Sequence, residues 1–347
     1  MVTFGLILWA YKVPPKAPKS YASDPHIGNA RRVEALVGIC LLIFVNMFVV
    51  GKRYLNSDDF MTPRQFSSHF NQRTVDKIIL EDKSPSYRVA DLTTDIFNDS
   101  YNSFWHKNIG GYSPAKLQRY QDLIDRYLTK ELQSVFVAFS GAKTLQDMES
   151  ALPDLKVMSA LNTKYLIVNE EVPPVVNRGA YGNAWFVDGF VEAATPDDEI
   201  GLIESTDLKT TAIIGADFKT PSVLRSEAKD SVSDTIQMTY YSPNELHYHY
   251  VAASDRPVVF SEVYYPKGWH ASVDPSTGSG SELELFRVDW ILRGAVLPAG
   301  EHDIVMRFDP KVYPVSENVS KASSITLLLL IAAAVAGMIL GRKRKTE

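Results

Sequence analysis

The chain has 347 residues, 45% of them hydrophobic and 22% charged, with a formal net charge of -5 at pH 7. This length allows two globular domains together with membrane segments. The net negative charge gives no indication of nucleic-acid binding, for which a basic composition is expected. The single cysteine, Cys40, excludes an internal disulfide framework.

The chain begins with an apolar stretch that is too short to span a bilayer. Residues 1–11 supply about half of the roughly 20 residues that a membrane helix needs, and neither a preceding basic residue nor a cleavage site indicates a signal peptide. We therefore expect a partial membrane helix whose beginning is missing. A polar loop follows at residues 12–32, where four prolines argue against a regular helix: Pro14, Pro15, Pro18 and Pro25.

The second apolar stretch, residues 33–51, is long enough to cross a membrane. Five basic residues in the loop before it place that loop in the cytoplasm by the positive-inside rule. Lys52 and Arg53 on the far side oppose this orientation but are fewer. The helix is therefore expected to run outward, and a buried core helix is the alternative.

Residues 52–220 mix helical and strand patterns, which predicts an extracytoplasmic α/β domain. Strands are expected at residues 87–92, 165–168 and 211–214. Helices are expected at residues 114–128, at 155–161 and from Pro196 onward. Ser113 and Thr195 suit the N-caps of the first and last of these helices, and Asn162 suits the C-terminal turn of the second.

The least ordinary segment of this domain is residues 95–112, which we call the aromatic loop. It places aromatic rings beside amide, carboxylate and basic groups, and it ends in Gly110-Gly111, which allows a sharp turn. Rings stack on sugar faces while polar groups bind hydroxyls, so this composition favours glycan recognition. The candidate ligand-binding residues are Asp95, His106, Lys107 and Tyr112. In the structural alternative, the rings cover the sheet and the polar groups cap the loop.

From residue 230 to 315 the hydrophobic period changes to two, and seven short segments alternate as strands. Turn residues separate them, which predicts a β-sandwich of immunoglobulin-like or jelly-roll type. His247 and His249 share one face of a strand, as metal ligands would, but no cysteine or close carboxylate pair accompanies them. A solvated strand face is the favoured interpretation.

Residues 322–341 form a third apolar stretch, without charge and about 30 Å long as a helix at about 1.5 Å per residue. The basic residues of the tail, 342–347, mark its cytoplasmic end. The two complete helices then anchor the chain in the lipid bilayer and leave most of it outside the cytoplasm. The expected fold class is a membrane-anchored α+β protein.

No motif identifies a chemical reaction. Ser140 lies in Ala-Phe-Ser-Gly rather than in a nucleophile elbow, and the sequence contains no phosphate-binding glycine loop. We therefore predict no catalytic residue, no metal site and no cofactor.

Short motifs distributed from Lys52 to the end of the chain are specific in combination. They are Lys52-Arg53-Tyr54-Leu55, Phe97-Asn98-Asp99, His106-Lys107-Asn108-Ile109-Gly110-Gly111-Tyr112, Ala115-Lys116-Leu117-Gln118-Arg119-Tyr120-Gln121, Leu161-Asn162-Thr163-Lys164-Tyr165, Gly182-Asn183-Ala184-Trp185-Phe186-Val187, Tyr265-Pro266-Lys267-Gly268-Trp269 and Leu297-Pro298-Ala299-Gly300-Glu301-His302. Together they resemble the C-terminal region of YfhO-family bacterial membrane proteins.

That family is similar to the polytopic GT-C glycosyltransferases, which take a sugar from a polyprenyl-phosphate donor outside the cytoplasm. The resemblance implies a bacterial cytoplasmic (inner) membrane location, with the bulk of the chain on the extracytoplasmic or periplasmic side. It also implies polyprenyl-phosphate sugar and envelope glycan as partners. The acidic catalytic residue of such folds lies in an early outer loop that this chain lacks, so Met1 within an apolar run fits a fragment, and enzymatic activity is left open.

Two interpretations follow. In the first, the chain is the C-terminal extracytoplasmic part of a polytopic membrane protein and assists glycosyl transfer to a cell-envelope acceptor. In the second, it is a non-catalytic envelope protein whose β-sandwich binds glycan or a protein partner.

Overall fold

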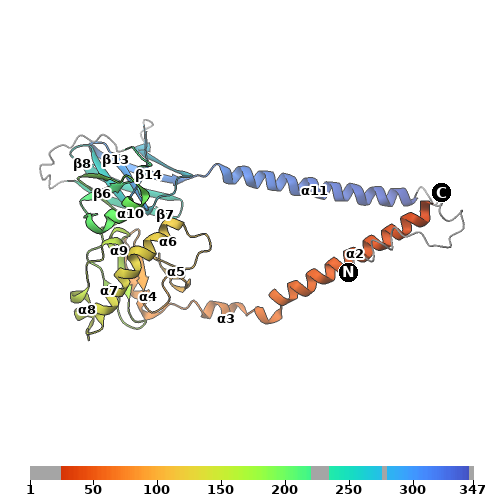
Figure 1. Cartoon of the computed structure of the whole chain (residues 1–347), viewed down its shortest axis with the longest axis horizontal. Helices are drawn as coiled ribbons and strands as arrows, with labels where there is room; N and C mark the ends of the chain where they lie inside the picture. Colours follow the sequence, from red (N-terminus) through yellow and green to blue (C-terminus); the bar gives the residue numbers. More distant parts are fainter. Residues whose placement is uncertain (1–24, 220–233, 276–279, 344–347) are drawn as a thin grey trace. The chain divides into compact units, whose positions relative to one another are not determined.

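The computed structural model describes residues 25–219, 234–275 and 280–343. Figure 1 shows a mixed α+β protein with several β-sheets, which confirms the coarse fold class. By its internal contacts the chain forms two compact units, Met1–Asn71 and Gln72–Glu347. The predicted partial membrane helix, residues 1–11, lies outside the described residues.

The described part of the first unit consists of helices. They are α2 (Pro25–Tyr54), η1 (Ser57–Asp59) and α3 (Pro63–Ser68). The expectation of an irregular loop up to residue 32 is wrong for its last part, because α2 already begins at Pro25. Proline is compatible with the first position of a helix, where the amide hydrogen that it lacks has no helical partner.

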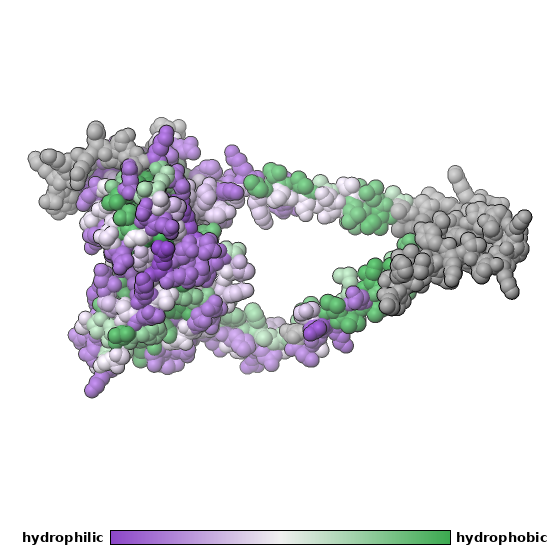
Figure 2. Space-filling model, viewed as in Figure 1, coloured by the Kyte–Doolittle hydropathy of each residue, from purple (hydrophilic) through white to green (hydrophobic). Residues whose placement is uncertain are grey.

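One segment of α2 has the length and composition of a membrane span. Within the described part of the chain, Glu34–Tyr54 is the helix segment that is long and apolar enough to cross a membrane, with a mean hydropathy of 2.3. Its side chains are largely exposed, and Figure 2 shows apolar residues gathered along it. A buried core helix does not fit this exposure, whereas a membrane anchor or a signal sequence does.

The second unit begins with a mainly helical part around a small sheet. Its elements are α4 (Thr74–Ile79), β1 (Arg88–Asp91), α5 (Tyr101–Trp105), α6 (Gln118–Leu123), the π-helical segment η2 (Ile124–Leu128), α7 (Thr129–Phe139), α8 (Leu145–Ala151), α9 (Lys156–Ala160), β2 (Thr163–Ile167) and β3 (Val175–Val176). Strands β1 and β2 are parallel, and β3 pairs with β2 in the antiparallel direction.

Two larger sheets follow. Their strands are β4 (Ala184–Phe186), β5 (Gly189–Glu192), β6 (Thr211–Ile214), β7 (Thr235–Ser242), β8 (Glu245–Ala252), β9 (Arg256–Val263), β10 (Trp269–Val273), β11 (Ser281–Leu283), β12 (Phe286–Val288), β13 (Leu292–Leu297) and β14 (Gly300–Phe308), with helix α10 (Pro196–Ser205) between β5 and β6. One sheet has the order β11-β10-β14-β8-β7, and the other has the order β4-β9-β13-β12-β6-β5.

The two larger sheets face each other across one apolar core. Strand β8 shows why: its residues alternate between buried and half-buried, so Leu246, Tyr248 and Tyr250 point to one side. On that side the ring of Tyr248 meets Phe260 of β9, with the ring centres 4.9 Å apart. The sheets therefore pack as a sandwich, while its immunoglobulin-like or jelly-roll type stays a prediction.

The six-stranded sheet takes strands from both predicted domains. β4, β5 and β6 lie within residues 52–220, and β9, β12 and β13 lie within residues 230–315. The largest hydrophobic core also crosses this boundary, since it joins Leu166 of the small sheet to Ile203 of α10 and Val288 of β12. The α/β part thus packs against the six-stranded sheet, and the core between the two larger sheets is a separate cluster.

The predicted helix at residues 114–128 differs from the structure at both ends. It begins at Gln118, with Leu117 rather than Ser113 at the N-cap. The backbone amide of Lys116 donates to the Ser113 carbonyl, which closes a separate turn before the helix. At the other end, the helix continues through η2 and α7 to Phe139.

The last element is α11 (Val312–Lys343), a helix of 32 residues that contains the predicted span 322–341. It starts earlier than the apolar stretch, with Pro314 in its first turn, where proline is tolerated. Its side chains from Val312 to Ile331 are exposed, and several of them are large and apolar (Figure 2). Whether α11 crosses a membrane stays a prediction.

Candidate functional site

The structure separates the four candidate residues of the aromatic loop. Asp95 is exposed and caps its own turn by accepting a hydrogen bond from the Asn98 side chain at 2.9 Å, which lowers the pKa of Asp95. Tyr112 is 66% exposed. The side chains of His106 and Lys107 enter two different clusters, with Asp76 and with Glu262, so the four side chains do not form one site.

The backbone of the loop explains this separation. A β-bridge between Val89 and Asn108 lays the segment beside β1, and His106 has an extended conformation. Neighbouring residues in extended backbone point in opposite directions, so His106 and Lys107 face different sides. Gly111 then turns the chain with a φ of +88°, in agreement with the predicted sharp turn.

His106 belongs to a buried network of ion pairs and hydrogen bonds. Its Nε2 lies 3.0 Å from Asp76 Oδ1, and Arg73 binds both Asp76 and Asp91, at 3.0 and 2.7 Å. Burial raises the pKa of Asp76, but its bonds with His106 and Arg73 outweigh burial and lower it overall. Because each charge has a partner, this network ties α4 to β1 and to the aromatic loop.

Lys107 belongs to a second cluster, which we call the basic cluster: Arg88, Lys107 and Arg293 around Glu262. Lys107 Nζ lies 3.5 Å from Glu262 Oε1 and 3.1 Å from the centre of the Tyr241 ring. Arg88 Nη2 lies 3.8 Å from Glu262 Oε2. The four charges come from β1, the aromatic loop, β9 and β13, which are far apart in the sequence.

The basic cluster carries more positive than negative charge, and the pKa values reflect it. Burial raises the pKa of Glu262, but the charges of the three cations outweigh burial, so this pKa is lowered overall. Burial also lowers the pKa of Lys107 to about 8, against the opposing effect of Glu262. The pKa of Arg293 is likewise lowered by burial.

A pocket of about 180 Å³ lies next to Arg293, at one edge of the sandwich. The turn from β9 to β10 forms the rim of this pocket. Pro266 and Gly268 form the turn between Tyr265 and Trp269, and Gly268 has a φ of +94°. This turn is the motif Tyr265-Pro266-Lys267-Gly268-Trp269 singled out in the sequence.

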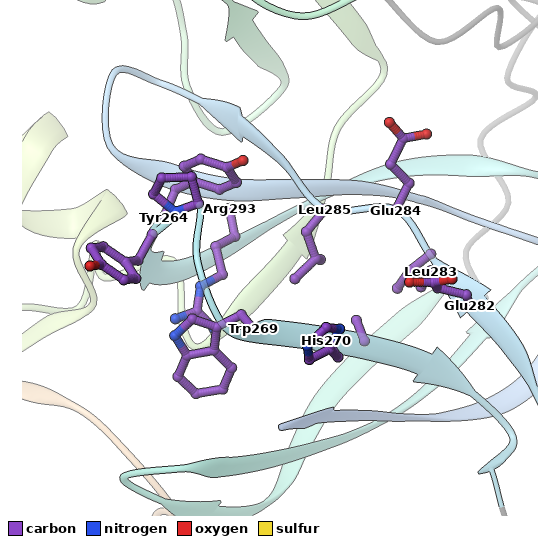
Figure 3. A pocket seen from close by; sticks show the side chains of 11 residues that line it. Tyr264, Trp269, His270, Glu282, Leu283, Glu284, Leu285 and Arg293 are labelled. Carbon is purple, nitrogen blue, oxygen red and sulfur yellow. The ribbon is translucent and has the colours of Figure 1, made fainter. Parts of the chain in front are cut away.

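The pocket has two unlike ends (Figure 3). At one end the guanidinium of Arg293 lies beside the Trp269 ring, 3.9 Å from the ring centre, with Tyr264 nearby. At the other end lie the exposed carboxylates of Glu282 and Glu284. Aromatic rings for stacking and charged groups for hydrogen bonding thus line one cavity.

The predicted histidine pair does not take part in this pocket. His247 Nε2 lies 2.8 Å from Glu245, and His249 Nδ1 lies 2.9 Å from Asp303, in a partly solvated strand region. Within residues 25–219, 234–275 and 280–343 no group of three or more histidine, cysteine or acidic residues has the arrangement of a metal site.

Sequence reasoning placed Lys107 among the candidates but missed the residues that surround it. The available signal was a single charge inside an apolar strand pattern: Arg293 interrupts Ile291 to Val296, and Glu262 interrupts Val258 to Tyr264. A charged residue at such a position is buried and needs a partner, but the pattern does not say which partner.

Comparison of this chain with protein-family models, with curated proteins and with solved structures gives no match.

Proposed function

We propose that this chain is a membrane-anchored module that binds cell-envelope glycan through the pocket at Trp269. The observation that carries the proposal is the combination of Trp269, Tyr264 and Tyr265 with charged side chains around one cavity. A pyranose ring has an apolar face that stacks on an aromatic ring and hydroxyls that bind charged and polar groups. Trp269 is half-buried, so part of its surface remains accessible to a ligand.

Membrane anchoring is the second part of the proposal. The apolar segment Glu34–Tyr54 supports a span near one end, and the apolar stretch of α11 supports a second span near the other. With both helices in a bilayer, the sandwich lies on the extracytoplasmic side. The positive-inside arrangement of the flanking basic residues favours this side.

Both interpretations of the sequence are compatible with this binding. As the C-terminal part of a YfhO-type glycosyltransferase, the module holds the acceptor glycan while another region of the protein transfers the sugar. As a non-catalytic envelope protein, it holds glycan without transfer. The pocket favours a glycan over a protein partner, because a cavity of about 180 Å³ accommodates a small group rather than a flat protein surface.

The proposal is tested by measuring glycan binding of the full chain in lipid nanodiscs. The probe is a panel of isolated bacterial cell-wall polysaccharides and their fragments. Trp269→Ala removes the stacking ring and is expected to weaken binding on the order of thirty-fold, as for an aromatic residue at the centre of a binding site.

Tyr112→Ala is the matched control, because it removes an exposed ring from the aromatic loop and leaves the pocket intact. Its binding is expected to equal that of the unmodified chain. If Tyr112→Ala abolishes binding while Trp269→Ala does not, the aromatic loop is the site. If no glycan binds to the unmodified chain, the proposed function is wrong.

A further inference from the structure

Arg293 is a buried cation that lies beyond ion-pair distance of every carboxylate in the described residues. It is 4% exposed, and in the described part of the chain it forms no ion pair. Its Nε donates to the Val263 carbonyl at 3.1 Å, and its guanidinium covers the Trp269 ring. A buried charge is costly unless it is paired and hydrogen-bonded, so an unpaired guanidinium that lines a cavity indicates a site suited to an anion.

A neighbouring arginine shows the ordinary arrangement. Arg287 stands opposite Arg293 in the β12–β13 pair and is 8% exposed. Its Nη2 lies 3.0 Å from Glu199 and 3.0 Å from Asp217. Two arginines at facing positions are thus similarly buried, but only Arg287 is neutralised by carboxylates.

Glu262, the carboxylate of the basic cluster, already pairs with two other cations. Glu262 lies within 3.8 Å of Arg88 and within 3.5 Å of Lys107, and it compensates one positive charge at most. The basic cluster therefore keeps an excess of positive charge, and Arg293 is its member that lines the pocket. This excess attracts an anionic group of a ligand.

The carboxylates at the other end of the pocket determine how a ligand is oriented in it. Glu282 and Glu284 repel an anion but accept hydrogen bonds from hydroxyl groups (Figure 3). The cavity of about 180 Å³ corresponds to about six water molecules at roughly 30 Å³ each, which is the size of one sugar ring rather than of a polymer.

We infer that the pocket binds an acidic sugar residue, whose carboxylate or phosphate group pairs with Arg293 while its hydroxyls face Glu282 and Glu284. This inference rests on the proposed glycan binding and adds the chemical class of the sugar. A guanidinium is suited to both anions, because its planar fork donates two parallel hydrogen bonds to a carboxylate or a phosphate. The ring of the sugar lies against Trp269.

Three sugars with the same ring test the inference: glucose, glucuronate and glucose 6-phosphate. Their binding to the full chain in nanodiscs is measured by titration calorimetry. We expect one or both charged sugars to bind at least about ten-fold more tightly than glucose, because the charge-assisted bond to Arg293 is made only with them. Comparing the two charged sugars shows whether the natural anion is a carboxylate or a phosphate.

Arg293→Met is expected to abolish the preference for charged sugars, and Arg287→Met, the control, to keep it. Thermal unfolding without ligand adds a second readout. Arg293→Met removes an unpaired cation and should leave Tm unchanged or higher, whereas Arg287→Met strands two carboxylates and should lower Tm. If Arg293→Met does not fold, Arg293→Lys, which keeps the charge but loses the fork, is expected to reduce the preference.

The outcomes separate this inference from the proposed function. Equal binding of glucose and the charged sugars would overturn the acidic-sugar inference and leave glycan binding in place. A loss of Tm in Arg293→Met as large as in Arg287→Met would also overturn it, since Arg293 would then be a paired structural cation. Absence of binding by all three sugars and by the cell-wall panel would overturn both.

Discussion

At the scale of single residues, the buried charged side chains of this protein differ in how far they are paired with opposite charges. The His106 network is closed, since Arg73 and His106 satisfy Asp76. In the basic cluster, by contrast, Arg293 forms no ion pair with a carboxylate of the described residues. Lys107 is only partly paired: its Nζ donates a hydrogen bond to Ser86 Oγ at 2.7 Å and lies 3.5 Å from Glu262, and its side chain is 27% exposed.

The partial burial of Lys107 predicts a pH dependence of stability. Its pKa is lowered from 10.5 to about 8 in the folded protein. Between these values the unfolded lysine keeps a proton that the folded one has lost, so the free energy of unfolding rises with pH. The stability gained in this way is fully present above pH 10.5 and is lost as the pH falls to about 8. Its slope is at most about 1.4 kcal/mol per pH unit.

Lys107→Met should remove that dependence. Urea unfolding of the full chain in micelles, followed by tryptophan fluorescence at pH 7.5 and 9.5, gives the difference in free energy between the unmodified chain and the variant. We expect the difference to shift in favour of the unmodified chain as the pH rises. Lys77→Met, at an exposed position of α4, should show no such shift. An unchanged or opposite difference for Lys107→Met would contradict the burial argument.

At the scale of elements, local signals located several helix ends correctly. Thr195 caps α10, since its Oγ1 accepts a hydrogen bond from the Asp198 amide at 3.2 Å, and Pro196 follows at the first position. Asn162 adopts a positive φ of 55° after α9, as expected for a C-terminal turn. Both signals involve residues within one turn of each other, where chain connectivity guarantees the contact.

Removal of the cap at Thr195 should therefore destabilise the second unit. Thr195→Ala leaves the Asp198 amide without its side-chain acceptor and is expected to lower the free energy of unfolding by about 1 kcal/mol. Thr195→Ser keeps the hydroxyl and should restore most of this loss. Chemical denaturation of the three chains gives the comparison. Equal loss in the serine and alanine variants would show that the methyl group, rather than the cap, matters.

At the scale of the whole molecule, the proposed topology has the loop at residues 12–32 and the basic tail at residues 342–347 in the cytoplasm and the sandwich outside. Apolar side chains are exposed along α2 and α11, where they have no protein partner to cover them in the described residues (Figure 2). Such exposure is unfavourable in water and favourable in a bilayer.

Cysteine labelling tests this topology. In a Cys40→Ala background, a cysteine at Ser57 is expected to react with a membrane-impermeant maleimide on intact cells or spheroplasts, because it follows the outer end of α2. A cysteine at Thr346, in the basic tail, should react only after the membrane is permeabilised. Labelling of Thr346→Cys alone in intact cells would invert the topology, and labelling of both without permeabilisation would exclude a cytoplasmic tail.

The sequence by itself determined what depends on neighbouring residues. Apolar runs marked the long helices, alternation marked strands such as β8, and Thr195 and Asn162 marked helix ends. Their physical basis is local, since side-chain periodicity and capping involve residues within a few positions. The segment from Glu282 to Val288, predicted as one strand, forms β11 and β12 in different sheets. The same reasoning was wrong at Ser113 and Pro25, where more than one local conformation was compatible with the residues.

Only the tertiary structure decided which distant residues meet. Strands β4, β5 and β6 join a sheet with β9, β12 and β13, although composition suggested separate domains. Lys107 meets Glu262, 155 positions away, while Asp95 and Tyr112 remain at the surface. Strand pairing and the burial of a charge such as Arg293 depend on contacts between segments far apart in the chain, and hydrophobic patterns specify that a face is buried but not what covers it.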